Sequence, residues 1–267
     1  MADKRISGSG QIRVYIGKCF RLFITEKQWK NFLSTLIIIL IIYLVTGKDM
    51  FRVYKDTRSG VFAIASACIW AGLFNSIRSV CRERDIIKRE HRTGLRISSY
   101  ILAHVVYEAF LCGGEALIVL LVTLIRNIGH LPPAGVITVM PFDLFLTFFL
   151  IIFSSDMIAL LVSCIVRSEN TAMTIMPFIL VVQLVMSGVI FELKGLADKI
   201  SYATISRFGV EGVMAVARTD AYVDFYAKSK ENLTAVILKD WGVLLGFCVL
   251  YIVLSIIILR FVDRDER

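Results

Sequence analysis

Several motifs that would assign an enzymatic activity are missing from this 267-residue sequence. It has no Gly-x-x-x-x-Gly-Lys-Ser/Thr sequence, whose backbone amides hold nucleotide phosphates, so we do not expect the chain to hydrolyse ATP alone. It has no His-Glu-x-x-His sequence or similar cluster, and zinc needs three or four ligands, so we expect no metal site and no cofactor in the chain. Residues 1–31 are polar and basic, which argues against a cleavable signal peptide. Internal repeats and polar stretches long enough for a second, soluble domain are also absent.

Apolar residues, by contrast, are abundant. They make up 57% of the chain, and the mean hydropathy is +0.73, whereas soluble domains are roughly 45–50% apolar. Runs long enough to cross a bilayer as helices occur at 32–46, 59–77, 98–125, 140–166, 171–191 and 240–262. We therefore predict an all-α protein in a lipid bilayer, with a cytoplasmic start and interfacial amphipathic helix within 1–31 and a six-helix transmembrane domain over 32–267.

The net charge of +8 is concentrated next to the apolar runs. Basic residues crowd 1–31 and the hairpin 78–96, which the positive-inside rule places in the cytoplasm. The segment 192–238 balances its basic and acidic residues, as an external loop does, although the basic loop 47–58 does not fit this topology. We expect both termini in the cytoplasm and no binding of nucleic acid, because the charge does not form one folded basic face.

Other features concern the interior of the predicted bundle. Ionisable residues in a span must face protein or water, and four of them form a predicted buried polar network: His104, Glu108, Glu115 and Asp156. We interpret this network as fixing the bundle rather than conducting protons. Gly113-Gly114 and Pro177 are predicted bending points, and 201–216 is too short to span, so we predict a re-entrant element there.

A set of short sequences carries a resemblance to a known family. In chain order they are Glu83-Arg84, Arg89-Glu90, Gly94, Arg96-Ile-Ser-Ser-Tyr100, Ser187-Gly-Val-Ile190 and Ile205-Ser-Arg-Phe-Gly-Val-Glu-Gly212. In order and spacing the chain resembles the membrane (permease) domain of ABC exporters of the G subfamily, the white or pleiotropic-drug-resistance type, within the type-2 ABC permeases. It departs from them in lacking a proline in the 205–212 stretch, and in having Arg78 where some relatives carry an acid.

The resemblance implies a membrane subunit that moves a hydrophobic or amphipathic substrate out of the cytoplasm or inner leaflet by alternating access. The external segment lacks the cysteines of many eukaryotic relatives, so we expect a bacterial plasma membrane. The implied partners are a nucleotide-binding ATPase, which would hold ATP and Mg, and a second permease copy in a homodimer or heterodimer. The residues implied to couple to the ATPase, in a coupling helix after the second span, are Glu83, Arg84, Ile86, Arg89, Glu90 and Gly94. Those implied to line a substrate cavity are Trp70, Ala71, Phe74, Asn75, Met176, Leu180, Gln183 and Leu184. Those implied to form an apolar gate are Val189 and Ile190.

Two other functions remain open at this point. The same loops would serve a membrane scaffold that binds a partner without transporting anything. An intramembrane enzyme would need the acids and histidine of the third and fourth spans to converge around water. A central cavity between two copies of the chain would argue against both.

Overall fold

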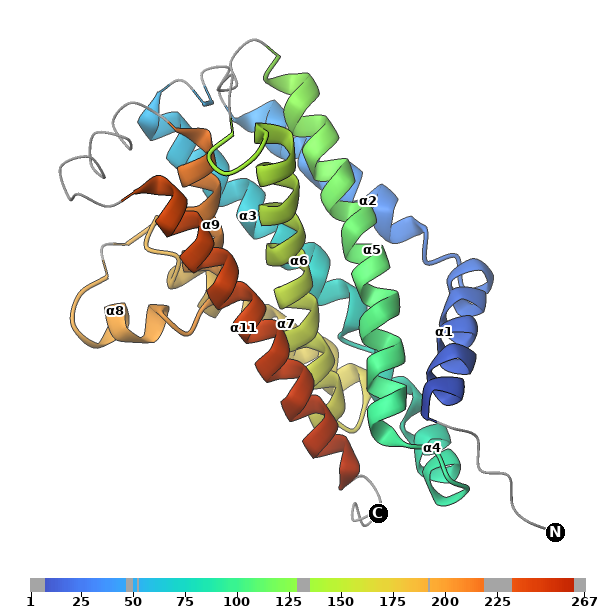
Figure 1. Cartoon of the computed structure of the whole chain (residues 1–267). Coiled ribbons are helices and arrows are strands. Elements are labelled where there is room, and N and C mark those ends of the chain that lie inside the picture. Colours follow the sequence, from blue (N-terminus) through green and yellow to red (C-terminus); the bar gives the residue numbers. More distant parts are fainter. Residues whose placement is uncertain are drawn as a thin grey trace.

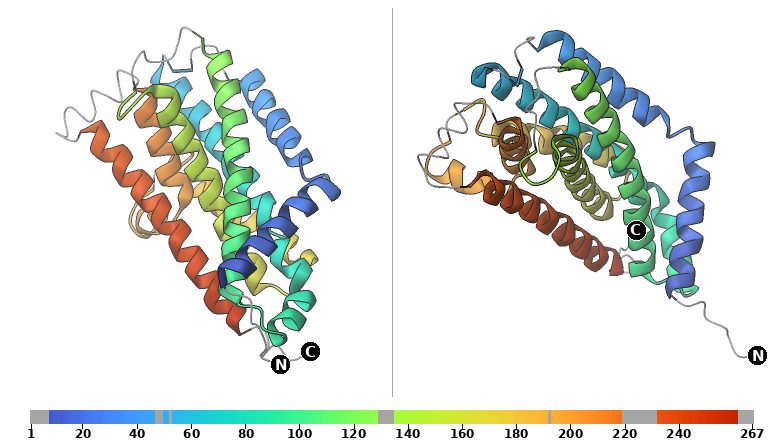
Figure 2. Two further views of the ribbon diagram at one scale, coloured as in Figure 1. Left: turned by 45° about the vertical axis from the view of Figure 1, so that its right-hand side comes forward. Right: turned by 45° about the horizontal axis from the view of Figure 1, so that its top comes forward.

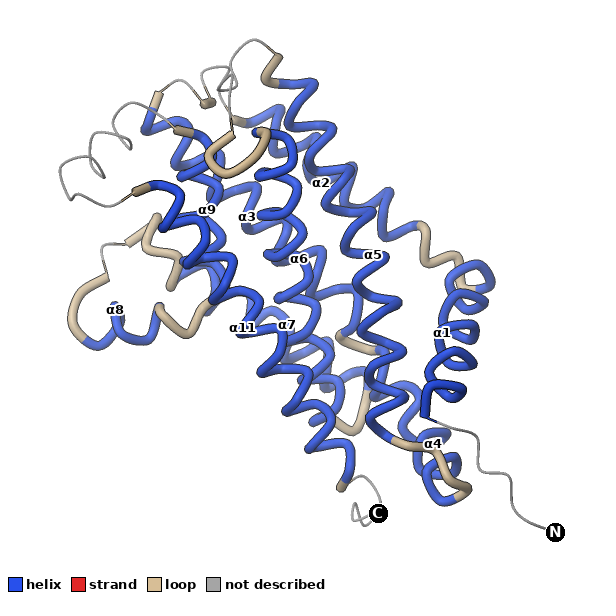
Figure 3. The backbone as a smooth tube through the Cα atoms, viewed as in Figure 1, coloured by secondary structure: helices blue, strands red, loops and turns tan. Residues whose placement is uncertain are grey.

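The computed structural model describes residues 8–46, 50–51, 53–128, 135–191, 193–218 and 232–261. These residues form helices joined by loops, without any strand (Figure 3), which confirms the predicted all-α class. The helices are α1 (Gly8–Thr25), α2 (Lys30–Val45), α3 (Tyr54–Ser76), α4 (Ser79–Arg92), α5 (Ile97–Arg126), α6 (Met140–Ile165), α7 (Glu169–Val185), α8 (Leu196–Ser201), α9 (Ile205–Ala217) and α11 (Leu233–Arg260), shown in Figure 1.

The core of the bundle is α6, which packs against α3, α5, α9 and α11. Most of its side chains are buried, and the hydroxyls of Ser154 and Ser155 donate to backbone carbonyls one turn earlier, so these polar groups are satisfied inside the core. Helices α3 and α6 approach closely at Gly72, where an added Cβ would lie 2.2 Å from the Ile152 carbonyl oxygen. Small residues at such contacts let membrane helices pack tightly.

By length and composition, four helical stretches among the described residues are able to cross a membrane: Tyr54–Arg92, α5, α6 and α11. Counting the pair α1 and α2 as one broken span, bent by 65°, raises this to five. Helix α7 is apolar but has only 17 residues. The multi-pass character is thus supported, whereas the count of six spans stays a prediction.

Helix α7 also ends six residues before the predicted limit at 191. After Val185 the chain turns: the Ser187 hydroxyl donates to the Leu184 carbonyl (2.8 Å), and Gly188 has a φ of +74°. A positive φ suits glycine and ends the helical path. The predicted span 171–191 is therefore too long, because its last residues form this turn.

Neither predicted bending point interrupts its helix. Helix α5 is continuous through Gly113 and Gly114, and α7 is continuous through Pro177. Gly114 instead makes room for a neighbour, since an added Cβ would lie 2.8 Å from the Phe32 ring. The glycine pair is thus partly a packing feature, and the expected break in α5 is absent.

The two ends of the bundle differ. Helix α4, the start of α1 and the end of α11 gather at one end, and α9 lies toward the other (Figures 1 and 2). Within the predicted re-entrant segment, α9 buries most of its residues against α3, α6 and α11. The chain termini and much of the predicted external loop, residues 219–231, lie outside the described residues.

Candidate coupling site and membrane interior

Helix α4 forms as an amphipathic helix whose start is capped by the core. Val80, Cys81 and Ile87 are buried on its inner face. The first turn of a helix has amides without intrahelical partners, and here the backbone amides of Val80 and Cys81 both donate to the Ser163 hydroxyl on α6, at 3.0 and 3.1 Å. The end of α6 thus fixes the start of α4.

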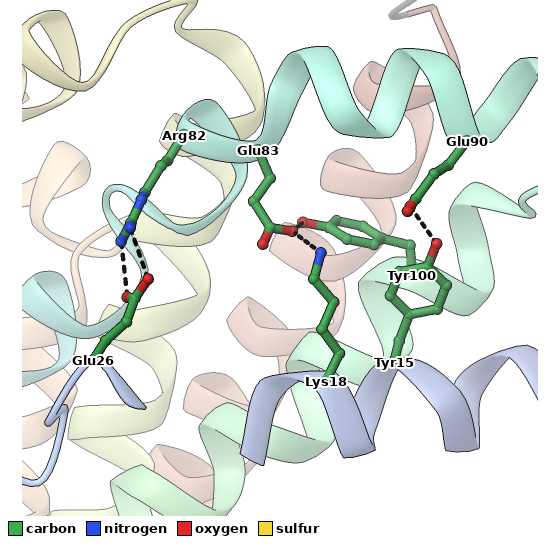
Figure 4. Close-up of polar contacts among 7 residues, drawn as sticks. All are labelled: Tyr15, Lys18, Glu26, Arg82, Glu83, Glu90 and Tyr100. Carbon is green, nitrogen blue, oxygen red and sulfur yellow. Dashed lines mark hydrogen bonds and ion pairs between the residues drawn. The ribbon is translucent and has the colours of Figure 1, made fainter. Parts of the chain in front are cut away.

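A set of side-chain contacts binds α4 to α1 and α5 (Figure 4). The Lys18 ammonium forms an ion pair with Glu83 at 2.9 Å, and the Tyr100 hydroxyl donates to the same carboxylate at 3.2 Å. Two turns further along α4, Glu90 accepts a hydrogen bond from the Tyr15 hydroxyl. Burial, followed by the hydrogen bond and charge of Glu90, raises the pKa of Tyr15 well above its usual range, so this hydroxyl keeps its proton at neutral pH.

Two arginines extend this bracing. Arg82 binds Glu26 through two parallel bonds of 2.8 and 2.7 Å, the bidentate geometry that favours arginine over lysine (Figure 4). Arg84 donates to the Cys164 and Val166 carbonyls, at 2.9 and 3.0 Å, where α6 leaves its last carbonyls without helical partners. Helix α4 is therefore held from two sides.

The end of α4 is fixed as well. Gly94 has a φ of +111°, and the Leu95 amide reaches back to the Glu90 carbonyl at 2.9 Å, the pattern of a glycine C-cap. The side-chain amide of Gln11 on α1 donates to the Gly94 carbonyl (3.2 Å) and accepts from the Arg96 amide (3.0 Å). This turn sets the direction in which α5 begins.

The outer face of α4 is exposed, and its exposed residues are spaced as on one side of a helix. It comprises Arg82, Asp85, Ile86, Arg89 and Arg92, which we call the α4 stripe. Of the residues implied to couple to an ATPase, Ile86 and Arg89 lie on this stripe. The carboxylates of Glu83 and Glu90 and the guanidinium of Arg84 contact their own chain instead.

The coupling role of all six residues stays a prediction. The geometry divides them into an inward set that braces α4 and an outward pair available to a partner. Sequence reasoning missed Asp85, which lies on the stripe next to Ile86. Its signal was its position three residues after Arg82 and four before Arg89, a spacing that places residues on one helix face.

The residues of the predicted polar network are all buried, but they separate into two places. The ring of His104 packs on Tyr100, with centroids 4.6 Å apart, next to the contacts of α4. Deeper in α5, Glu115 accepts from Asn75 at 2.9 Å and from Thr35 at 3.2 Å, tying α5 to α3 and α2.

Asp156 lies beside this second group. Its carboxylate accepts from the Cys112 thiol at 3.6 Å, and it interacts electrostatically with Glu108. Among the residues that the structure describes, no group of three or more His, Cys, Asp or Glu side chains is arranged to hold a metal ion. The arrangement is one of buried acids that crosslink helices.

Half of the predicted cavity residues line one small pocket. Trp70, Ala71, Phe74 and Asn75 surround a space of about 80 Å³ between α2, α3 and α5, which Glu115 also lines. The rings of Trp70 and Phe74 lie 5.0 Å apart. The lining thus combines aromatic and polar side chains.

The other four predicted cavity residues lie on α7 and do not line this pocket. Met176, Leu180 and Gln183 are buried within the single chain, and Leu184 is half-buried. The Gln183 side chain accepts from the Ser206 amide at 3.1 Å, which ties α7 to α9. Their place in a cavity between two copies stays a prediction. The large apolar side chains of α7 that are exposed in the single chain lie on the opposite face, with Phe178 the most exposed of them.

The predicted gate residues lie in the turn after α7. Val189 is half-buried and Ile190 is exposed. The preceding carbonyl, of Gly188, accepts from the Arg58 guanidinium at 2.8 Å, which holds the turn against the start of α3. Val189 lines a pocket of about 320 Å³ together with residues of α3, α8 and α9, but no contact tests a gating role.

Comparison with known proteins assigns a family to this architecture. Residues 10–217, from α1 to the end of α9, match the family described as ABC-2 type transporter. Over 143 residues, 53% of the chain, the sequence is 27% identical to the ABC transporter ATP-binding/permease protein Rv1747 of Mycobacterium tuberculosis. That match spans only 16% of the relative's length. Because the family match covers most of the chain, this protein belongs to the ABC-2 type transporter family, as a multi-pass membrane domain.

Proposed function

We propose that the chain is the translocation subunit of an ATP-driven exporter of the G-subfamily type. It pairs with a second permease copy and with a nucleotide-binding ATPase that holds ATP and Mg, and it moves a hydrophobic or amphipathic substrate outward by alternating access. The observation that carries this proposal is the α4 stripe, an exposed helix face on an element whose opposite face is bound to the rest of the domain.

The composition of the stripe suits a protein partner. Asp85 and Arg89 are charged and exposed, and Ile86 beside them is 38% exposed, whereas the exposed Arg82 uses its guanidinium to bind Glu26. An apolar side chain surrounded by charged groups is typical of the centre and rim of a protein interface. Its position at the end of the bundle rich in basic residues is that of a cytoplasmic surface.

The bracing provides a route for coupling. A partner that displaces α4 also displaces α1, through Lys18 and Tyr15, and the end of α6, through Arg84. Nucleotide binding drives a conformational change only if it favours one state of the membrane domain over the other. Contacts made by the stripe in one state and lost in the other would supply that difference.

Two further parts of the proposal have separate support. The name of the mycobacterial relative joins an ATP-binding function to a permease, which favours an ATPase as the partner of α4. The aromatic side chains of Trp70 and Phe74 in the pocket favour an apolar or amphipathic substrate. The G-subfamily assignment rests on the order of the short sequences given above.

Co-purification from the native host tests the proposal. We expect an ATPase to accompany the wild-type chain, and Ile86→Asp with Arg89→Glu to weaken that association at least tenfold. The matched control is Leu196→Asp with Lys199→Glu, the same changes at exposed positions of α8, which should retain the ATPase. A folded wild-type preparation without any ATPase would overturn the proposal in favour of a scaffold or an enzyme.

A further inference from the structure

Helix α1 carries a basic groove on its outer side. Residues on one stripe of the helix line a space of about 480 Å³: Arg13, Val14, Gly17, Lys18, Arg21, Leu22 and Thr25. Three of them are cationic and none is acidic. Gly17 deepens the groove, since an added Cβ there would meet nothing within 4 Å.

The position of the groove is set by the other face of α1. Phe20 and Phe23 pack with Tyr107 in a small apolar cluster on α5. Arg13 and Arg21 are exposed on the other face of the helix, whereas Lys18 at the edge of the groove reaches Glu83 on α4. Helix α1 is bent by 65° from α2 and lies at the outer rim, at the α4 end (Figure 2). If α1 lies along the membrane interface, as its amphipathic sequence predicts, this face meets the lipid headgroups.

The groove combines the two properties of a lipid site. Arginine and lysine recognise phosphate oxygens, and Arg13, Lys18 and Arg21 are spaced along one side of the helix. Val14 and Ile24, beside them, are 65% and 75% exposed, which suits contact with acyl chains. An amphipathic helix with basic and apolar residues in this arrangement binds at the membrane interface.

We propose that this groove binds the headgroup of an anionic phospholipid of the leaflet on the α4 side. The lipid phosphate lies against Arg13 and Arg21, and Lys18 contributes from the edge of the groove. Because Lys18 also forms the ion pair with Glu83 at 2.9 Å, the bound lipid acts on the same lysine that holds α4. The proposal uses the function above only in placing α4 at the cytoplasmic leaflet.

Native mass spectrometry of the full chain, titrated with phosphatidylglycerol or phosphatidylcholine, tests the proposal. We expect the wild-type chain to retain phosphatidylglycerol in preference to phosphatidylcholine. Arg13→Gln and Arg21→Gln should each weaken retention of phosphatidylglycerol about fivefold, and the double variant should combine both losses. The matched control is Lys27→Gln with Lys30→Gln, which removes the same charge from exposed positions outside the groove and should leave retention unchanged.

A second variant separates shape from charge. Gly17→Phe fills the groove while leaving every cation in place, and we expect it also to weaken retention of phosphatidylglycerol. Equal retention by wild type and by Arg13→Gln with Arg21→Gln would overturn the proposal. A loss of ATPase association by Arg13→Gln with Arg21→Gln, with lipid retention unchanged, would also overturn it, because the groove would then hold a protein segment. The lipid measurement needs no ATPase, so its result is independent of the coupling proposal.

Discussion

The contact between α3 and α6 at Gly72 allows a quantitative test of the fold. In Gly72→Ala the new Cβ would lie 2.2 Å from the Ile152 carbonyl oxygen and 3.0 Å from the Asp156 amide nitrogen, whereas ordinary contact begins at 3.4 Å. The obstacle is backbone on a buried helix, so α3 and α6 must separate by about 1 Å. Overpacking typically costs about 1–3 kcal/mol, and we expect the upper part of this range, offset slightly by the better helix propensity of alanine.

The controls are the same substitution at other helical glycines. Gly113→Ala meets nothing within 4 Å and should be neutral or stabilising by up to about 1 kcal/mol. Gly60→Ala meets the Met50 sulfur at 2.8 Å, a side chain that can move, and should lie between the two. The assay is the free energy of unfolding in mixed micelles as a denaturing detergent is added. Equal stability of the Gly72→Ala and Gly113→Ala variants would refute the close approach of α3 and α6.

Three predictions concern the bracing of α4. Tyr15→Phe should cost about 1.5–3 kcal/mol of unfolding free energy, because it removes a hydrogen bond to a carboxylate. Glu90→Gln should cost less, because its amide oxygen still accepts from Tyr15 and only the charge is lost, and the double variant should cost little more than Tyr15→Phe alone; additive losses would contradict the contact. Since the pKa of Tyr15 is raised in the folded state, the difference between wild type and Tyr15→Phe should be constant below about pH 10, the unfolded pKa, and shrink as pH rises above it. Arg84→Gln should lower nucleotide-coupled transport in vesicles while the ATPase still co-purifies, since it frees α6 without altering the α4 stripe; loss of the ATPase itself would place Arg84 at the interface.

The fold was largely predictable because hydrophobic runs and charge clusters are local properties. The predicted spans at 98–125 and 140–166 agree with α5 and α6 to within a residue at each end. Glycine roles were not predictable, because they depend on what lies opposite. The pair at Gly113 suggested a break, yet α5 is continuous there, whereas Gly72 gave no signal until α6 was placed against it.

The candidate site, like the fold, was predictable only where its features are local in the sequence. The resemblance implied a coupling helix after the second span that includes Ile86, but adjacent residues of a helix point in different directions, and only the structure shows Ile86 exposed and Ile87 buried. Glu90 is one of the residues implied to couple to an ATPase, but in the structure it accepts a hydrogen bond from Tyr15, 75 positions away in the sequence. Contacts over such separations leave no local pattern, so sequence reasoning identified the helix and not its outward face.

The bend between α1 and α2 has a consequence for bilayer thickness. Helix α2 has 16 residues, about 24 Å at the rise of an α-helix, against a hydrocarbon core of about 30 Å. Helix α1 cannot rise to extend it, because its contacts with Glu83 and Glu90 tie it to α4. If α2 is one of the predicted spans, the shortfall of about 6 Å falls on the lipid, and we expect the bilayer to be thinner beside α2 than its usual hydrocarbon core.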